Sequence, residues 1–328
     1  MNRWKRRSAA ALVTLLTAVS IGWTAPSASA PTPQATASPP VEEPVGTFRE
    51  ETRVAWVLVP VGVQDGGRWV RDLDRRHFRL SVDGEPVAFP DFDATDAAVS
   101  LVFLQDLSGS MANGGKLEAS RAALGELIAA AAPADELALA SFAGGELAVE
   151  VPFTREESVL TESMALWQAY GTTALHDAVA WIPEIAIEGR HPKRAVVLIT
   201  DGVDNASQLD PAAAREVVRR ARLPVFVLGL GRESLGAAAG DIFRGDVRTY
   251  GALLQRLAGA TGGRYLPLAR PEDAAAAARG LLDELRSQYV LAFPTAPGPA
   301  AERLLSVSVE SVGATVYHRR AYFGGPPL

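Results

Sequence analysis

The sequence predicts an α/β fold in which a doubly wound, mostly parallel, Rossmann-like sheet is inserted into a small antiparallel β-sandwich. Between residues 96 and 287, short apolar runs alternate with helical stretches, which is the pattern of parallel βαβ units. Residues 48–95 and 288–328 instead contain short runs that alternate polar and apolar side chains, as antiparallel strands do. Because neither end has enough strands for a stable sandwich alone, we expect the two ends to pair with each other.

The first thirty residues have the features of an export signal. A basic start is followed by an apolar stretch from Ala9 to Trp23 and by Ala28-Ser29-Ala30, a typical cleavage site. The apolar stretch is short for a membrane span. We therefore expect residues 1–30 to be a cleaved signal peptide and residues 31–47, rich in Pro, Ala and Ser, to be a linker. The mature protein is expected to be secreted or periplasmic, without stable insertion in a membrane.

The composition is that of an ordinary globular protein, since 48% of the 328 residues are hydrophobic and 21% are charged. The net charge is −6, and loss of the signal lowers the basic residues from 32 to 28 against 38 acidic ones. This acidic balance disfavours binding to nucleic acid or to anionic lipid. The chain has no cysteine, which excludes disulfides and a lipid-modified amino-terminal cysteine.

The two end segments are expected to supply the strands of the sandwich. Residues 53–59 and 77–82 alternate as strands do, and the turn signals Asp65-Gly66-Gly67 and Asp83-Gly84 follow them. Near the other end, three further strands are expected over residues 288–293, 304–312 and 315–323.

The middle of the chain alternates strands with helices. Apolar strands are expected over residues 99–104, 137–142, 195–199 and 225–230, with an antiparallel edge strand over 148–153. Helices are expected over about residues 116–132, 155–168, 174–187, 211–222, 249–259 and 272–287. This alternation predicts a parallel sheet with helices packed on its faces.

Polar oxygens follow the first of these apolar strands. The strand ends near Leu104, and Asp106, Ser108 and Ser110 then alternate with single residues on one tight loop. A helix is expected to begin near Lys116, so the loop joins the carboxyl end of a strand to a helix. Open α/β sheets bind their ligands at this edge.

Similar oxygen donors recur twice downstream. Thr173 follows Gly171 in a turn before a helical stretch, and Asp201 directly follows the apolar strand around residues 196–200. Together with the first loop they make a set of two carboxylates and three hydroxyls, a type of site that suits Mg²⁺ or Mn²⁺. Because so few donors do not saturate such an ion, the set leaves a position for an outside ligand.

At these residues the chain resembles the von Willebrand factor type A domains, over about residues 97–287. Their metal-ion-dependent adhesion site consists of Asp-x-Ser-x-Ser, a distant Thr and a distant Asp, matched here by Asp106, Ser108, Ser110, Thr173 and Asp201. The resemblance implies a doubly wound sheet flanked by helices, a bound Mg²⁺ (or Mn²⁺ or Ca²⁺), and a carboxylate of a partner protein as the last metal ligand. Thr172 and Asp204 lie close to these ligands in the sequence, and we expect them to contact the ligands and not the metal.

The arrangement is also similar to a bacterial subfamily of secreted proteins in which such a domain is bracketed by strand segments. The residues that carry this weaker resemblance are Asp72-Leu73, residues 78–84, residues 285–291 and residues 320–323.

The function expected from the sequence is that of an exported protein-binding module that captures an acidic group through the metal. The alternative is a structural component of an envelope assembly, in which the metal only stabilises the loop. An enzyme is not expected, because Ser108 lacks the Gly-x-Ser-x-Gly context of α/β hydrolases and no nucleophile and base are visible together. His176 is the histidine nearest to the loop residues in sequence, and we expect it on a helix surface.

Overall fold

The computed structural model of the protein describes most of the chain beyond the predicted linker. The described residues are 55–94, 97–202, 204–220, 223–230, 247–295, 301–310 and 313–324. The predicted signal peptide and linker lie outside them. Among the described residues, no helix is long and apolar enough to cross a lipid bilayer.

The central sheet has six strands in the order β11-β10-β9-β6-β7-β8. These strands are β11 (Tyr265–Pro267), β10 (Val225–Gly229), β9 (Lys193–Thr200), β6 (Val99–Asp106), β7 (Glu136–Ala143) and β8 (Glu146–Thr154). Neighbouring strands run parallel from β11 to β7, and β8 pairs with β7 antiparallel at the edge. This confirms the predicted α/β fold class, including the antiparallel edge strand. The short strand β11 was absent from the sequence-based prediction.

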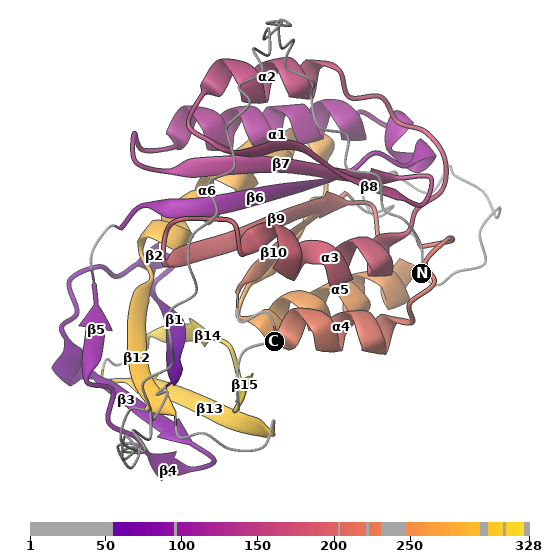
Figure 1. Ribbon diagram of the computed structural model, residues 1–328. Coiled ribbons are helices and arrows are strands. Elements are labelled where there is room, and N and C mark those ends of the chain that lie inside the picture. The colour runs from indigo at the N-terminus through magenta and orange to yellow at the C-terminus, as the bar shows by residue number, and fades with distance from the viewer. Residues whose placement is uncertain are drawn as a thin grey trace, which may run out of the picture. The chain divides into compact units, whose positions relative to one another are not determined.

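Helices cover both faces of this sheet, and side chains of β6 pack alternately toward each face. Helices α1 (Lys116–Ala130), α2 (Glu157–Ala165) and α6 (Ala274–Arg286) lie on one face, against Leu101 and Phe103 (Figure 1). Helices α3 (Leu175–Ala186), α4 (Pro211–Arg220) and α5 (Val247–Thr261) lie on the other, against Val102 and Leu104. Burial on both faces explains why residues 101–104 of β6 are a continuous apolar run rather than an alternating one.

The two ends of the chain pair with each other, as the sequence predicts. Strand β1 (Ala55–Asp65) pairs with β12 (Tyr289–Thr295) and β14 (Thr315–His318), while β5 (Asp91–Asp93) extends the sheet and β2 (Arg68–Trp69) adds to β1. A second sheet has the order β15-β13-β3-β4, from β15 (Ala321–Phe323), β13 (Glu302–Val309), β3 (Phe78–Val82) and β4 (Glu85–Pro86). Buried side chains of both sheets form one core, including Val59, Phe78 and Leu305. Short 3-10 turns occur at Arg75–His77, Gly109–Ala112 and Pro271–Asp273.

The last predicted strand, over residues 315–323, is two strands that belong to different sheets. Strand β14 pairs with β1, whereas β15 pairs with β13. The chain crosses between the sheets at Arg319, whose buried guanidinium donates a hydrogen bond of 2.6 Å to the carbonyl of Leu58. One straight strand cannot serve both sheets, and the pattern of residues 315–323 does not show which sheet each part joins.

The hydroxyl of Tyr289 fastens the start of β12 to the segment after β2. It donates to the carbonyl of Val70 at 2.9 Å and accepts from the backbone N–H of Leu73 at 3.1 Å. The ring packs against Phe78, with ring centroids 4.9 Å apart. Burial raises the pKa of the Tyr289 hydroxyl. Tyr289, which follows the end of helix α6 in the sequence, therefore links the two end segments.

Candidate metal-binding site

The candidate site lies where β6 and β9 end side by side. These parallel strands pair along Val99 to Gln105 of β6, so their carboxyl ends reach the same edge of the sheet. Asp106 is the last residue of β6, and Asp201 follows Thr200, the last residue of β9. The two carboxylates, which are far apart in the sequence, therefore meet at one sheet edge, where open α/β sheets bind ligands.

Asp106 is fully buried and its carboxylate is held on both oxygens. Oδ1 accepts a hydrogen bond of 2.9 Å from the backbone N–H of Ser108, and Oδ2 accepts one of 2.6 Å from the hydroxyl of Thr200. Burial, together with the negative charge of Asp201, raises the pKa of Asp106 to about 6 in the protein without metal. Asp106 and Asp201 thus lie close enough to repel each other, and a cation between them would relieve that repulsion.

The serine hydroxyls of the first loop lie together. Ser108 Oγ and Ser110 Oγ are 3.2 Å apart, and Ser108 is buried whereas Ser110 is partly exposed. Ser108 has an extended backbone and directly precedes the 3-10 turn Gly109–Ala112, and Ser110 is the second residue of that turn. The pair can offer two neutral oxygens to one ion.

Thr173 follows a segment that is hydrogen-bonded to the first loop. The N–H of Tyr170 donates to the carbonyl of Leu107 at 2.8 Å, and that of Gly109 donates to the carbonyl of Gly171 at 3.1 Å. Gly171 has a φ of +68°, and a Cβ there would lie 2.8 Å from the Cα of Gly144. Only glycine fits this backbone approach. Thr173 is buried, and its N–H donates to Asn205 Oδ1 at 2.8 Å, which ties this loop to the loop that follows Asp201.

Asp201 forms a buried ion pair with Lys116, the first residue of helix α1. Lys116 Nζ lies 2.8 Å from Asp201 Oδ2, and the two side chains are 6% and 3% exposed. The same ammonium donates a hydrogen bond of 3.2 Å to the carbonyl of Ser110. Lys116 therefore contacts two of the predicted site residues.

Thr172 and Asp204, the two residues predicted to contact the ligands, differ in exposure and in their hydrogen bonds. Thr172 is exposed, and its carbonyl accepts a hydrogen bond of 2.7 Å from the N–H of Gly144. Asp204 accepts hydrogen bonds from the N–H of His176 at 3.1 Å and from the hydroxyl of Ser207 at 2.5 Å. Asp204 thus fastens its own loop to the start of helix α3, next to Thr173.

The expectation that His176 lies on a helix surface is wrong. Its side chain is 14% exposed, and its Nδ1 lies 3.3 Å from Asp204 Oδ2. The loop that follows Asp201 folds over the first turn of α3 and covers the ring. The physical reason is local, since the N–H groups of the first helical turn need acceptors and Asp204 provides one.

Sequence reasoning missed Thr200 and Lys116. Thr200 donates to Asp106 and its hydroxyl accepts from the N–H of Gly202 at 3.0 Å, so it orients the buried carboxylate. Thr200 had one usable signal, since it is a polar residue at the end of a strand that is otherwise apolar. Lys116 also had one, because a cation in the first turn of a helix opposes the helix dipole and indicates a local anion.

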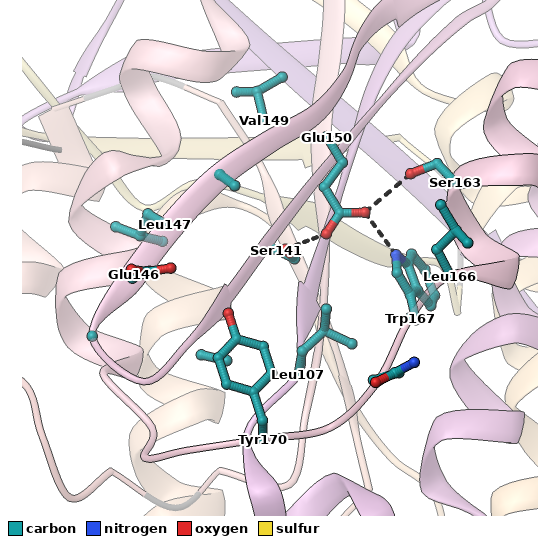
Figure 2. A pocket seen from close by; sticks show the side chains of 14 residues that line it. Leu107, Ser141, Glu146, Leu147, Val149, Glu150, Ser163, Leu166, Trp167 and Tyr170 are labelled. Atoms are coloured by element: carbon teal, nitrogen blue, oxygen red, sulfur yellow. Dashed lines mark hydrogen bonds between the residues drawn. The ribbon is translucent and has the colours of Figure 1, made fainter. Parts of the chain in front are cut away.

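A pocket of about 570 Å³ adjoins the site. Leu107, between Asp106 and Ser108 in sequence, lines it together with Tyr170 and residues of β7 and β8. Figure 2 shows Glu150 on its wall, accepting hydrogen bonds from Ser141 (2.5 Å), Ser163 (3.0 Å) and the indole of Trp167 (2.8 Å). These bonds fasten the end of α2 to the edge of the sheet. The pocket therefore has one wall that is held in place by Glu150, and Leu107 brings the pocket next to Asp106 and Ser108 in sequence.

The donors that meet at the sheet edge fit a hard divalent cation. Within the described part of the chain, no group of three or more His, Asp or Glu side chains is suited to a metal, so hydroxyls must contribute. The two carboxylates and the Ser108–Ser110 pair are such donors. Lys116 pairs with Asp201, and the buried Asp106 carboxylate beside this pair and the two serine hydroxyls favours a further cation here.

Solved structures to which the chain is similar come from several bacteria. An aerotolerance-related membrane protein from Bacteroides fragilis NCTC 9343 is 21% identical, with 57% of this chain and 98% of that chain covered and a TM-score of 0.46. A von Willebrand factor type A protein from Catenulispora acidiphila is 14% identical, with 85% and 76% covered and a TM-score of 0.48. The vWF domain of the type V pili tip protein Mfa5 from Porphyromonas gingivalis is 13% identical, with 56% and 94% covered and a TM-score of 0.44.

No curated protein matches the chain. A family model, the von Willebrand factor type A domain, matches residues 101–203. This range begins in β6 and ends just beyond Asp201, so it spans all five predicted ligands. Residues 101–203 of the chain therefore match the von Willebrand factor type A domain family.

Proposed function

We propose that the protein is an exported binding module that holds a divalent cation and uses it to capture a carboxylate of a partner protein. The cation is Mg²⁺, with Mn²⁺ or Ca²⁺ as substitutes, and its ligands are Asp106, Ser108, Ser110, Thr173 and Asp201. The observation that carries the proposal is the buried Asp106 carboxylate, held beside a second carboxylate and next to a pair of serine hydroxyls. Lys116 balances one of the two carboxylates, and the negative charge that remains favours a cation among these oxygens.

Each residue of the site has a role that follows from its contacts. Thr200 and the N–H of Ser108 fix the Asp106 carboxylate, so little ordering remains for ion binding. The partly exposed Ser110 marks the side on which the site faces solvent. A bound cation would supply a point of attraction for an incoming anion on that side. The adjoining pocket leaves room for a neighbouring side chain of the partner.

The first experiment is calorimetric titration of the metal-free protein with Mn²⁺, comparing wild type with Asp106→Asn. Wild type is expected to release or take up heat with one site per chain, and the variant is expected to show none. Asp83→Asn is the matched control, because it makes the same substitution at an exposed turn of the end-segment sheets. Equal heats from wild type and Asp106→Asn would contradict the proposed site.

The second experiment addresses export and partner capture. Mass spectrometry of the mature protein is expected to find Pro31 as the first residue, as the predicted cleavage site requires. Wild type immobilised on beads is then exposed to an envelope extract with Mg²⁺ or with a chelator. Capture that the chelator abolishes supports metal-dependent binding, whereas capture that the chelator leaves unchanged favours the purely structural role.

A further inference from the structure

We propose that Lys116 sets the net charge of the metal site and thereby makes the loaded site selective for anions. The inference rests on the proposed function and deepens it, since it concerns which ligands the same site accepts. Its basis is the buried contact of the Lys116 ammonium with Asp201 and with the carbonyl of Ser110.

The contact is part of the interior of the domain and not a surface ion pair. Both side chains are nearly inaccessible to solvent, at 6% and 3% exposure, and Nζ and Oδ2 are 2.8 Å apart. Buried pairs are screened little by solvent or salt, so the charge of Lys116 acts at full strength on its neighbours. Lys116 is moreover fixed at the start of helix α1, close to the serine loop.

The position of Lys116 indicates that its charge stabilises the predicted site and not helix α1. A cation at the amino end of a helix opposes the helix dipole, and helices favour acidic residues there. At this position, Lys116 makes helix α1 less stable than a neutral residue would. Its contacts with Asp201 and Ser110, two of the predicted ligands, offset that cost.

The charges of the buried groups then determine what the loaded site attracts. Asp106 and Asp201 bring two negative charges when ionised, and Lys116 cancels one of them. A divalent cation converts the remaining single negative charge to a single positive one. A site with one positive charge is neutralised by a single carboxylate, whereas without Lys116 the loaded site would already be neutral. Lys116 therefore lowers the affinity of the site for the cation and raises the affinity of the loaded site for an anion.

The test measures Mn²⁺ affinity by calorimetry in wild type, Lys116→Gln and Lys116→Arg, each in chloride and in acetate at matched ionic strength. Acetate is the probe for a carboxylate ligand. Arg121→Gln, which removes one charge from the same helix where the guanidinium contacts the carbonyl of Trp167, is the matched control. Thermal unfolding of each variant confirms that it folds.

The expected result is that Lys116→Gln binds Mn²⁺ on the order of tenfold more tightly than wild type, because a nearby positive charge is gone. Acetate should tighten Mn²⁺ binding to wild type and to Lys116→Arg, and this gain should disappear in Lys116→Gln. Arg121→Gln should behave as wild type. Mn²⁺ binding by Lys116→Gln but not by wild type would overturn both, because the wild-type site would then never be loaded.

Other outcomes overturn the inference. If Lys116→Gln folds and binds Mn²⁺ with the affinity of wild type, the charge of Lys116 does not matter and the proposed function stands alone. If wild type binds Mn²⁺ equally in chloride and acetate, the loaded site has no preference for anions, a result that needs no variant. If neither protein binds Mn²⁺, the inference and the proposed function both fail.

Discussion

Replacing Asp106 by asparagine is expected to stabilise the metal-free protein at neutral pH. The folded chain holds the Asp106 pKa at about 6, against 3.8 for an ordinary aspartate, because the carboxylate is buried beside Asp201. This difference corresponds to about 3 kcal/mol of folding free energy that is lost when the buried carboxyl ionises. Asparagine has no charge to lose. It does exchange the Thr200 hydrogen bond for a poorer one, at a cost of about 1 kcal/mol, so the net gain at pH 7 is about 2 kcal/mol.

The pH dependence has a defined sign. Between about pH 4 and pH 6 the unfolded chain has released the Asp106 proton while the folded chain retains it, so the free energy of unfolding falls as pH rises. The difference in stability between wild type and Asp106→Asn should therefore favour the variant increasingly across this interval and level off above it. Other titrating groups are common to both proteins and cancel in the difference.

The assay is urea unfolding in chelator at several pH values between 4 and 7, for wild type, Asp106→Asn and Asp201→Asn. The last variant is the contrast, because it leaves the buried Lys116 ammonium without its carboxylate and should lose about 3 kcal/mol. A variant Asp106→Asn that is less stable than wild type at pH 7, or a pH-independent difference, would refute the reasoning.

Three further changes test the packing of the fold, each by urea unfolding unless stated otherwise. Tyr289→Phe loses the hydroxyl that bonds to Val70 and Leu73 and should destabilise by about 1–2 kcal/mol with an unchanged fold by circular dichroism. Phe103→Ala empties a fully buried position between the sheet and its helices and should cost about 3–5 kcal/mol, so an effect below 1 kcal/mol would contradict the burial. Deletion of residues 301–328 removes β13, β14 and β15 and should make the amino-terminal strands sensitive to protease, whereas continued resistance would show that these strands do not need their partners.

Much of the fold could be predicted because local patterns reflect burial on defined faces. The run from Leu101 to Leu104 is apolar throughout since β6 has helices on both sides, and that property is visible in the sequence. The end strands alternate because one face of each sheet packs on the shared core. The crossing at Arg319 could not be predicted, because an apolar alternation does not say which sheet a strand joins.

The candidate site was predictable only in part. Asp106, Ser108 and Ser110 form a local motif, and the structure brings Asp201 close to Asp106 at the sheet edge. That these residues hold a metal stays a prediction. Lys116 escaped sequence reasoning because its contact with Asp201 exists only after α1 and β9 have packed on the same sheet.

The pairing of β1 with β12 also affects the order in which the chain can fold during synthesis. Val61 lies opposite Tyr289, so the first strand emerges from the ribosome on the order of tens of seconds before its partner does. The central sheet has its strands closer together in the sequence and can assemble in that interval. Until then β1 presents unpaired backbone groups, a state prone to aggregation, and a holding chaperone or rapid export would protect it. Completion of the two sheets formed by the end segments is therefore expected to be the last step in the folding of this protein.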